Sequence, residues 1–180
     1  MKVLVPIAHG SESLETITLA NVLRRAEIGV CIASIETSLA VEASRSITLM
    51  ADALFNEVGE QDYELIVLPG GKAGASHLAA CVPLIERLRR QRAAHRWYGA
   101  ICASPALTLS PHGLLDGKQA TCYPAFKDKL LHFVDQPIVQ DGHCITSQGP
   151  GTAMDYALHL VELLAGAERR RKVAAALLLP

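Results

Sequence analysis

Short aliphatic runs alternate along the chain with longer stretches in which apolar and polar residues are mixed. Aliphatic runs of about four to eight residues, bounded by Gly or Pro, predict buried strands. Stretches with apolar residues three or four positions apart predict amphipathic helices. The strands predicted in the first part of the chain are 2–7, 30–35, 64–68 and 98–101, with a weaker one at 47–50.

The predicted helices lie at 11–26, 82–94, directly after Cys102, 153–164 and 168–179. Ser11 is a suitable N-cap for the first of them, and we expect Leu14, Ile17 and Leu23 on one face of that helix. Past residue 113 the pattern is weaker. Short strands are predicted there at 119–122, 138–140 and 144–147.

The alternation of strands and helices predicts the fold class. Strands that are apolar on both faces and are separated by helices are typical of a parallel sheet with helices on both sides. No internal repeat or low-complexity tract interrupts the pattern. The sequence therefore predicts one α/β domain over residues 1–180, built on a doubly wound parallel sheet.

Composition narrows the range of partners. The 180 residues are 50% hydrophobic, and their net charge of −1 supplies no basic surface for nucleic acid or an anionic membrane. The apolar runs at 3–8 and 173–179 are too short to cross a bilayer. The five cysteines include no CxxC pair, which favours a reducing compartment. We expect a cytoplasmic protein without a membrane or nucleic-acid partner.

Cys102 is the strongest candidate for a reactive residue. It lies at a predicted strand-to-helix junction between the small residues Ala100 and Ser104, as a nucleophile elbow requires. The partial positive charge of a helix N-terminus is expected to lower the pKa of its thiol. The alternative is a buried, inert cysteine.

A second predicted strand ends at Pro69, Gly70 and Gly71. Paired glycines allow backbone N–H groups to approach a ligand, so this turn, together with the N–H of Ala103, can form an oxyanion hole. The alternative is a simple tight turn. The spacing does not match the GxGxxG pattern of dinucleotide-binding proteins.

A third junction carries Glu12 and Glu15. Acidic residues in a first helical turn commonly serve the helix dipole. A carboxyl beside a reactive thiol can instead share its proton and act as a general acid and base. The residues alone do not choose between the two glutamates.

The seven histidines form no metal-binding pattern, so no metal site is expected. His112 lies ten positions after Cys102 and can reach the pocket from the end of the following helix. A structural role for His112 is the favoured alternative.

Five motifs follow one another along the chain: GSESLET at 10–16, VLPGG at 67–71, AICASP at 100–105, Tyr123-Pro124 with KDK at 127–129, and TSQGPGT at 146–152. Together they resemble the DJ-one/ThiJ/PfpI superfamily, in particular the branch of the Parkinson-associated deglycase and its bacterial relative YajL. The resemblance implies a flavodoxin-like sandwich, similar to class I glutamine amidotransferases, and a homodimer.

The resemblance also assigns roles to residues. It implies Cys102 as the nucleophile and Glu15, rather than Glu12, as the carboxyl that hydrogen-bonds it. It implies the backbone N–H groups of Gly71 and Ala103 as oxyanion donors. No metal or cofactor is implied.

Further pocket residues are expected around this centre: Gly70, Arg45, His112 and Tyr123. Arg45 matches an arginine of a loop near the site and the dimer interface in this branch. Tyr123 stands where human-type members carry a histidine. An unperturbed tyrosine has a pKa of about 10 and is no base near neutral pH. The chain therefore supports a Cys102–Glu15 dyad rather than a triad.

The function implied is a cofactor-free, glutathione-independent glyoxalase and deglycase that acts on methylglyoxal, glyoxal and glycated protein. A redox-regulated chaperone or oxidative-stress sensor that works through Cys102 oxidation is the alternative. The older designation of similar sequences as thiazole monophosphate biosynthesis proteins carries no mechanism. Related proteases place a histidine after the elbow cysteine, where this chain has Ala103. Glutamine amidotransferases need His-x-Glu, and His159 and Glu162 have the wrong spacing.

Overall fold

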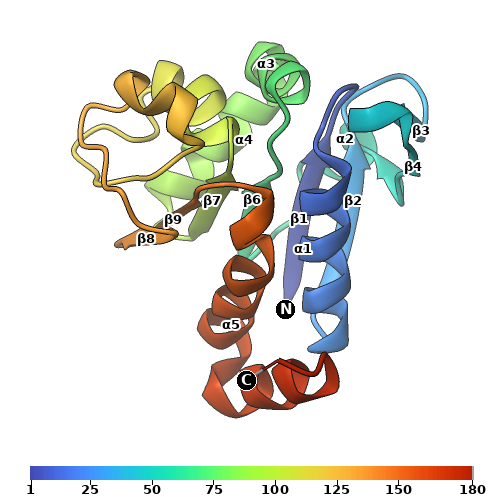
Figure 1. Ribbon diagram of the computed structural model, residues 1–180. Coiled ribbons are helices and arrows are strands. Elements are labelled where there is room, and N and C mark those ends of the chain that lie inside the picture. The colour runs from blue at the N-terminus through green and yellow to red at the C-terminus, as the bar shows by residue number, and fades with distance from the viewer. Residues whose placement is uncertain (180) are drawn as a thin grey trace.

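The computed structural model describes residues 1–179, and a seven-stranded sheet forms its centre (Figure 1). The strand order is β5-β2-β1-β6-β7-β9-β8, and the pairs are parallel except for β8 with β9. The bounds are β1 Lys2–Ile7, β2 Gly29–Ser34, β5 Ala53–Leu54, β6 Leu65–Leu68, β7 Trp97–Ile101, β8 Ile138–Asp141 and β9 Cys144–Ser147. The predicted fold class is confirmed.

Helices cover both faces of this sheet. They are α1 Ser13–Arg25, α2 Phe55–Val58, α3 Lys72–Ala80, α4 Val82–Ala93 and α5 Ala153–Ala176. Successive residues of β1 point to opposite faces, so Val3 and Val5 join the core under α1 and α5, whereas Leu4 joins the core under α3 and α4. Figure 1 shows α1 and α5 side by side on one face. Among residues 1–179, none of the helices has the length and apolarity that a bilayer-spanning segment needs.

The predicted strand at 47–50 exists, but it lies outside the central sheet. It is β4, Thr48–Met50, which pairs with β3, Ala40–Glu42, as a separate antiparallel ribbon. The turn between them contains Arg45, whose φ of 59° is in the left-handed region. The Ser44 N–H donates to the carbonyl of Ser11, which fixes this turn beside the start of α1.

Two details of the first helix differ from the prediction. The helix begins at Ser13 with Glu12 as its N-cap, while the buried Ser11 hydroxyl accepts from the N–H of Ala8. Leu23 is buried, but Leu14 is 51% exposed. Nine residues make two and a half helical turns, so Leu14 and Leu23 lie on opposite faces rather than on one.

Other elements differ more strongly from the prediction. Helix α3 lies in a segment for which no element was predicted. Residues 119–122 form only an isolated bridge, from Ala120 to Phe133. The segment after Cys102 is a π-helical turn, Pro105–Leu109, and not a regular α-helix. The two predicted C-terminal helices form one element, broken at Gly166, whose φ is 86°.

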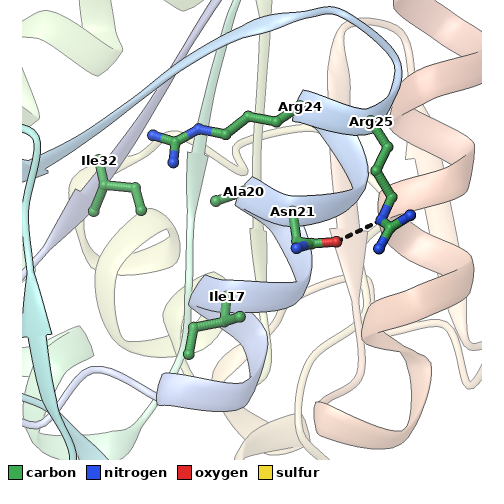
Figure 2. Close-up of a pocket in the computed structure, with 6 residues that line it drawn as sticks. All are labelled: Ile17, Ala20, Asn21, Arg24, Arg25 and Ile32. Atoms are coloured by element: carbon green, nitrogen blue, oxygen red, sulfur yellow. Dashed lines mark hydrogen bonds between the residues drawn. The ribbon is translucent and has the colours of Figure 1, made fainter.

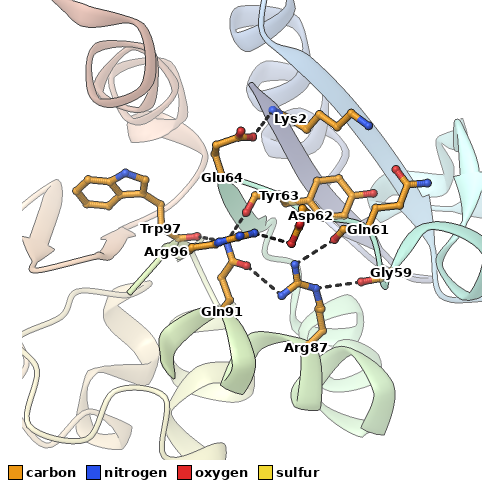
Figure 3. A network of polar contacts seen from close by, with 10 residues as sticks. All are labelled: Lys2, Gly59, Gln61, Asp62, Tyr63, Glu64, Arg87, Gln91, Arg96 and Trp97. Atoms are coloured by element: carbon orange, nitrogen blue, oxygen red, sulfur yellow. Dashed lines mark hydrogen bonds and ion pairs between the residues drawn. The ribbon is translucent and has the colours of Figure 1, made fainter. Parts of the chain in front are cut away.

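Side chains of α4 hold the amino ends of β6 and β7 in place (Figure 3). Arg87 donates to the side-chain oxygen of Gln91, and both residues are almost fully buried. Arg87 also donates to the carbonyls of Gly59 and Gln61. Gln91 donates to the carbonyls of Tyr63 and Trp97. Since Tyr63 precedes β6 and Trp97 begins β7, these contacts fix the amino ends of the two strands whose carboxyl ends carry the candidate site.

Candidate active site around Cys102

Cys102 directly follows β7 and has a left-handed backbone, with φ of 64°. Left-handed conformations cost a non-glycine residue energy, so neighbouring contacts must hold them. The Cys102 N–H donates to the carbonyl of Ser147 over 3.0 Å, and the Cys102 carbonyl accepts from the N–H of Tyr123 over 2.8 Å. The thiol is half-buried at this turn. These features are typical of a nucleophile elbow.

Glu15 reaches the same place from the first turn of α1. Its side chain is fully buried, and its Oε2 accepts from the Gly70 N–H over 2.7 Å. The carboxyl also interacts with the Cys102 thiol. Glu12, by contrast, caps the helix by accepting from the N–H of Leu14. The structure therefore places Glu15, and not Glu12, against the cysteine.

Burial sets the protonation of this pair. Loss of hydration raises the pKa of Glu15 from 4.5 to about 7, against the opposing effect of the Gly70 N–H. Loss of hydration, followed by the charge of Glu15, raises the pKa of Cys102 to about 12. The expectation that the helix N-terminus lowers the Cys102 pKa is therefore wrong, because loss of hydration outweighs the nearby backbone donors. A proton on Glu15 removes the second of these causes, the negative charge beside the thiol.

Two backbone N–H groups oppose this rise in the pKa. Those of Gly71 and Ala103 hydrogen-bond the Cys102 sulfur and stabilise its thiolate form. Gly71 has φ of 85°, and a Cβ there would lie 2.2 Å from the carbonyl oxygen of Gly10. A Cβ on Gly70 would lie 2.4 Å from the Cβ of Cys102. Gly70 is thus required for the close approach of this turn to Cys102, and Gly71 for its close approach to the loop before α1.

The remaining predicted pocket residues lie at different places. Tyr123 is 44% exposed and joins Cys102 through the backbone bond described above. Arg45 is exposed on the turn beside the start of α1. The His112 ring faces the carbonyl oxygen of Ala79 at 2.9 Å. That bond ties His112 to the end of α3, as its structural alternative requires.

One contact at the elbow was not anticipated. Ser104 was predicted only to be small, but its buried hydroxyl donates to the carbonyl of Pro69. The two residues are 35 positions apart. Only the adjacency of β6 and β7 could have suggested the bond. Within residues 1–179, no group of three or more His, Cys, Asp or Glu side chains is arranged to hold a metal ion.

The pattern of the DJ-1/PfpI family matches residues 1–163. The chain belongs to the DJ-1/PfpI family. This confirms the resemblance inferred from the five motifs, and it places the Cys102 elbow inside the region that the family shares.

Relatives of this DJ-1/PfpI chain cover most of its length. DJ-1 homolog A of Arabidopsis thaliana is 46% identical over 179 residues, which are 98% of this chain and 46% of that protein. The glutathione-independent glyoxalase DJR-1.2 of Caenorhabditis elegans is 34% identical over 163 residues, 88% of this chain and 86% of that protein. The chain spans less than half the length of Arabidopsis homologs A and B.

The fold agrees with solved structures of the DJ-1/PfpI family. Oxidized DJ-1 from Toxoplasma gondii superposes with a TM-score of 0.97 and 38% sequence identity, covering 99% of this chain and 98% of that one. The arrangement of helices and strands described above is therefore the one that these relatives share.

Proposed function

We propose that this chain is a glutathione-independent glyoxalase that acts on methylglyoxal or glyoxal, and a deglycase of their adducts on protein. The observation that carries the proposal is the convergence on Cys102 of a buried carboxyl with a raised pKa and two backbone N–H donors. A glyoxalase needs a soft nucleophile, a group that exchanges protons near neutral pH, and donors for a developing oxyanion.

The reaction begins with addition of the Cys102 sulfur to the aldehyde carbon. Ionised Glu15 accepts the thiol proton, and the new alkoxide accepts hydrogen bonds from the N–H groups of Gly71 and Ala103. Glu15 then returns that proton to the alkoxide, so the product of this step is a neutral hemithioacetal and Glu15 is ionised again. Because Glu15 removes the proton as the carbon–sulfur bond forms, the high pKa of the free thiol does not block the step.

Glu15 next moves a proton between the two carbons of the former dicarbonyl. It takes the proton from the carbon bound to sulfur and returns one to the neighbouring carbon, while the hydroxyl proton passes from the oxygen of the first carbon to the oxygen of the second. The hemithioacetal thereby becomes a 2-hydroxy thioester. Water then cleaves the thioester to release lactate from methylglyoxal, or glycolate from glyoxal, and restores the Cys102 thiol. The net reaction adds one water to the substrate and requires no cofactor.

Lactate formation from methylglyoxal without glutathione tests this proposal. Wild type should form many lactates per protein, whereas Cys102→Ser should form none. Glu15→Gln should lose turnover while its thiol remains open to alkylation. Stoichiometric consumption of methylglyoxal by the wild-type thiol, without lactate, would refute the glyoxalase assignment. Release of adducts from a methylglyoxal-treated peptide tests the deglycase activity in the same three proteins.

The half-buried thiol with adjacent N–H donors also supports a second function, a redox sensor or redox-regulated chaperone. Those donors would stabilise a sulfinate on Cys102 in the same way as an oxyanion. Mass spectrometry after peroxide treatment should find oxidation concentrated at Cys102. Suppression of aggregation that is equal in wild type and Cys102→Ser, before and after peroxide, would argue against this regulation.

We also propose that two copies associate through the outer face of α1 and the β3–β4 ribbon. Apolar side chains are exposed there, with Ile17 49% and Met50 68% accessible. A hollow of about 480 Å³ opens at Ile17 (Figure 2), and its other lining residues are Ala20, Asn21, Arg24, Arg25 and Ile32. Sedimentation should find a dimer for wild type and a monomer for Ile17→Glu. Leu131→Glu, which changes an exposed leucine outside α1 and the β3–β4 ribbon, is the control that should remain dimeric.

We propose a cytoplasmic location for this dimer. None of the cysteines among residues 1–179 is in a disulfide, as a reducing compartment favours. Fractionation of cells that express the full-length protein would test this location, and recovery in an oxidising compartment would contradict it.

A further inference from the structure

Three polar side chains follow Cys102 at intervals of four positions. They are Ser104, Thr108 and His112, and each lies against a backbone carbonyl of the neighbouring segment. The donor–acceptor distances are 2.5 Å to Pro69, 2.8 Å to Ala75 and 2.9 Å to Ala79. A carbonyl oxygen only accepts, so Nε2 of His112 carries the hydrogen. We refer to the three donors as the 104–108–112 row.

The local backbone brings this row onto one face. The π-helical turn Pro105–Leu109 has the Ser110 N–H bonded to the carbonyl five residues earlier. A tighter 3-10 turn, Ser110–His112, follows it, and from these two turns the three side chains reach carbonyls of one segment, residues 69–79. Ser104 and Thr108 are fully buried. Their hydroxyls are therefore shielded from competing water.

The row joins the two halves of the candidate site. Cys102 and Ala103 immediately precede its first member, and Gly70 and Gly71 immediately follow the acceptor Pro69. The ladder between β6 and β7 ends one step earlier, at the pair of Leu68 and Ala100. The row thus continues the connection between the two segments beyond the last strand pair.

We propose that Ser104, Thr108 and His112 are positioning residues that set the separation between the Cys102 sulfur and the Gly71 N–H. The kinetic part of this inference rests on the proposed glyoxalase function, whereas its effect on thiol reactivity does not. A reacting group displaced by about 1 Å can lose about 100-fold in rate. Loss of one of the three contacts is expected to lower kcat about tenfold.

Thr108 offers a matched pair of variants. Thr108→Val has nearly the same shape and lacks the donor, whereas Thr108→Ser keeps the donor. Ser76→Ala is the control, because the Ser76 hydroxyl donates to Lys72 within α3 and does not reach the elbow. Thr108→Val should lower kcat about tenfold with little change in KM. Thr108→Ser should restore kcat to near wild type, and Ser76→Ala should leave it unchanged.

Alkylation of Cys102 by iodoacetamide, measured against pH, provides the second readout. The Gly71 N–H favours the thiolate, so its displacement should move the alkylation profile of Thr108→Val and Ser104→Ala to higher pH. A purely structural row would lower Tm without moving this profile. If folded Thr108→Val kept the wild-type kcat and the wild-type pH profile of alkylation, the inference would be overturned, whatever the behaviour of Ser104→Ala. Absence of lactate turnover in wild type, with the alkylation shift present, would refute the glyoxalase function and support the row.

Discussion

The pH dependence of stability in Glu15→Gln follows directly from the burial of this carboxyl. The unfolded chain releases the Glu15 proton near pH 4.5, whereas the folded chain holds it up to about pH 7. Over this interval the folded state binds more protons than the unfolded state, so ionisation of Glu15 lowers the free energy of unfolding as the pH rises. The amide of the Glu15→Gln variant does not titrate, so the variant escapes this loss.

The size of the effect follows from the same interval. Each pH unit between the two pKa values corresponds to about 1.36 kcal/mol. From 4.5 to about 7, ionisation therefore costs wild type about 3 kcal/mol relative to Glu15→Gln. The cost is complete above about pH 7 and absent below about pH 4.5. For a domain of this size it corresponds to a Tm difference of roughly 6–12 °C.

Urea denaturation of both proteins at intervals between about pH 4 and pH 8 measures the difference. All other titrating groups are shared, so their contributions largely cancel. Cys102→Ser is the control, because burial is the largest cause of the raised Glu15 pKa and should persist without the thiol. A stability gap that stays constant with pH, or closes as the pH rises, would refute the assignment of a buried, protonated carboxyl.

Three further predictions test the packing of the fold. Gly70→Ala should lose about 1–3 kcal/mol of stability, because its Cβ would meet Cys102. Gly151→Ala is the control and should lose little stability, because the space around Gly151 is open. Equal Tm values for the two variants would contradict the close approach of Gly70 to Cys102. Leu23→Ala should cost about 2–5 kcal/mol and Leu14→Ala less than about 0.5 kcal/mol, and similar losses in urea denaturation would overturn the assignment of the α1 faces. Arg87→Met leaves carbonyls without their donors and should cost about 1–3 kcal/mol, so an unchanged Tm would rule out a stabilising role for that network.

The sequence predicted the elements whose local signals are strong. Aliphatic runs located β1, β6 and β7, and the small residues around Cys102 located the elbow. The resemblance to a family then selected Glu15, which spacing alone could not do. Glu12 and Glu15 are three positions apart and lie on nearly the same helical face. What separates them is the start of the helix at Ser13, which makes Glu12 the cap.

Long-range packing determined what the sequence could not predict. Helix α3 has glycine and small residues in place of a clear apolar stripe, so the periodicity of its sequence does not indicate a helix. Leu78 and Ala75 nevertheless bury one side of it against the sheet and the segment after Cys102. The donors of the 104–108–112 row are likewise ordinary polar residues until β6 and β7 lie side by side. No local pattern carries that information.

The position of α3 also explains how Glu15 reaches its partner. A Cβ on Gly74 would lie 2.4 Å from the backbone nitrogen of Ser11, so the first turn of α3 packs directly on the loop that precedes α1. The Glu12 N–H donates to the carbonyl of Gly70 over 2.9 Å, which ties the start of α1 to the same turn. With the helix start fixed there, Glu15 is one turn farther along and its carboxyl meets the Gly70 N–H. A bulkier residue at 74 would lift α1 away from this turn, so the alignment of Glu15 with Cys102 depends on a glycine whose added Cβ would meet neither of the two side chains.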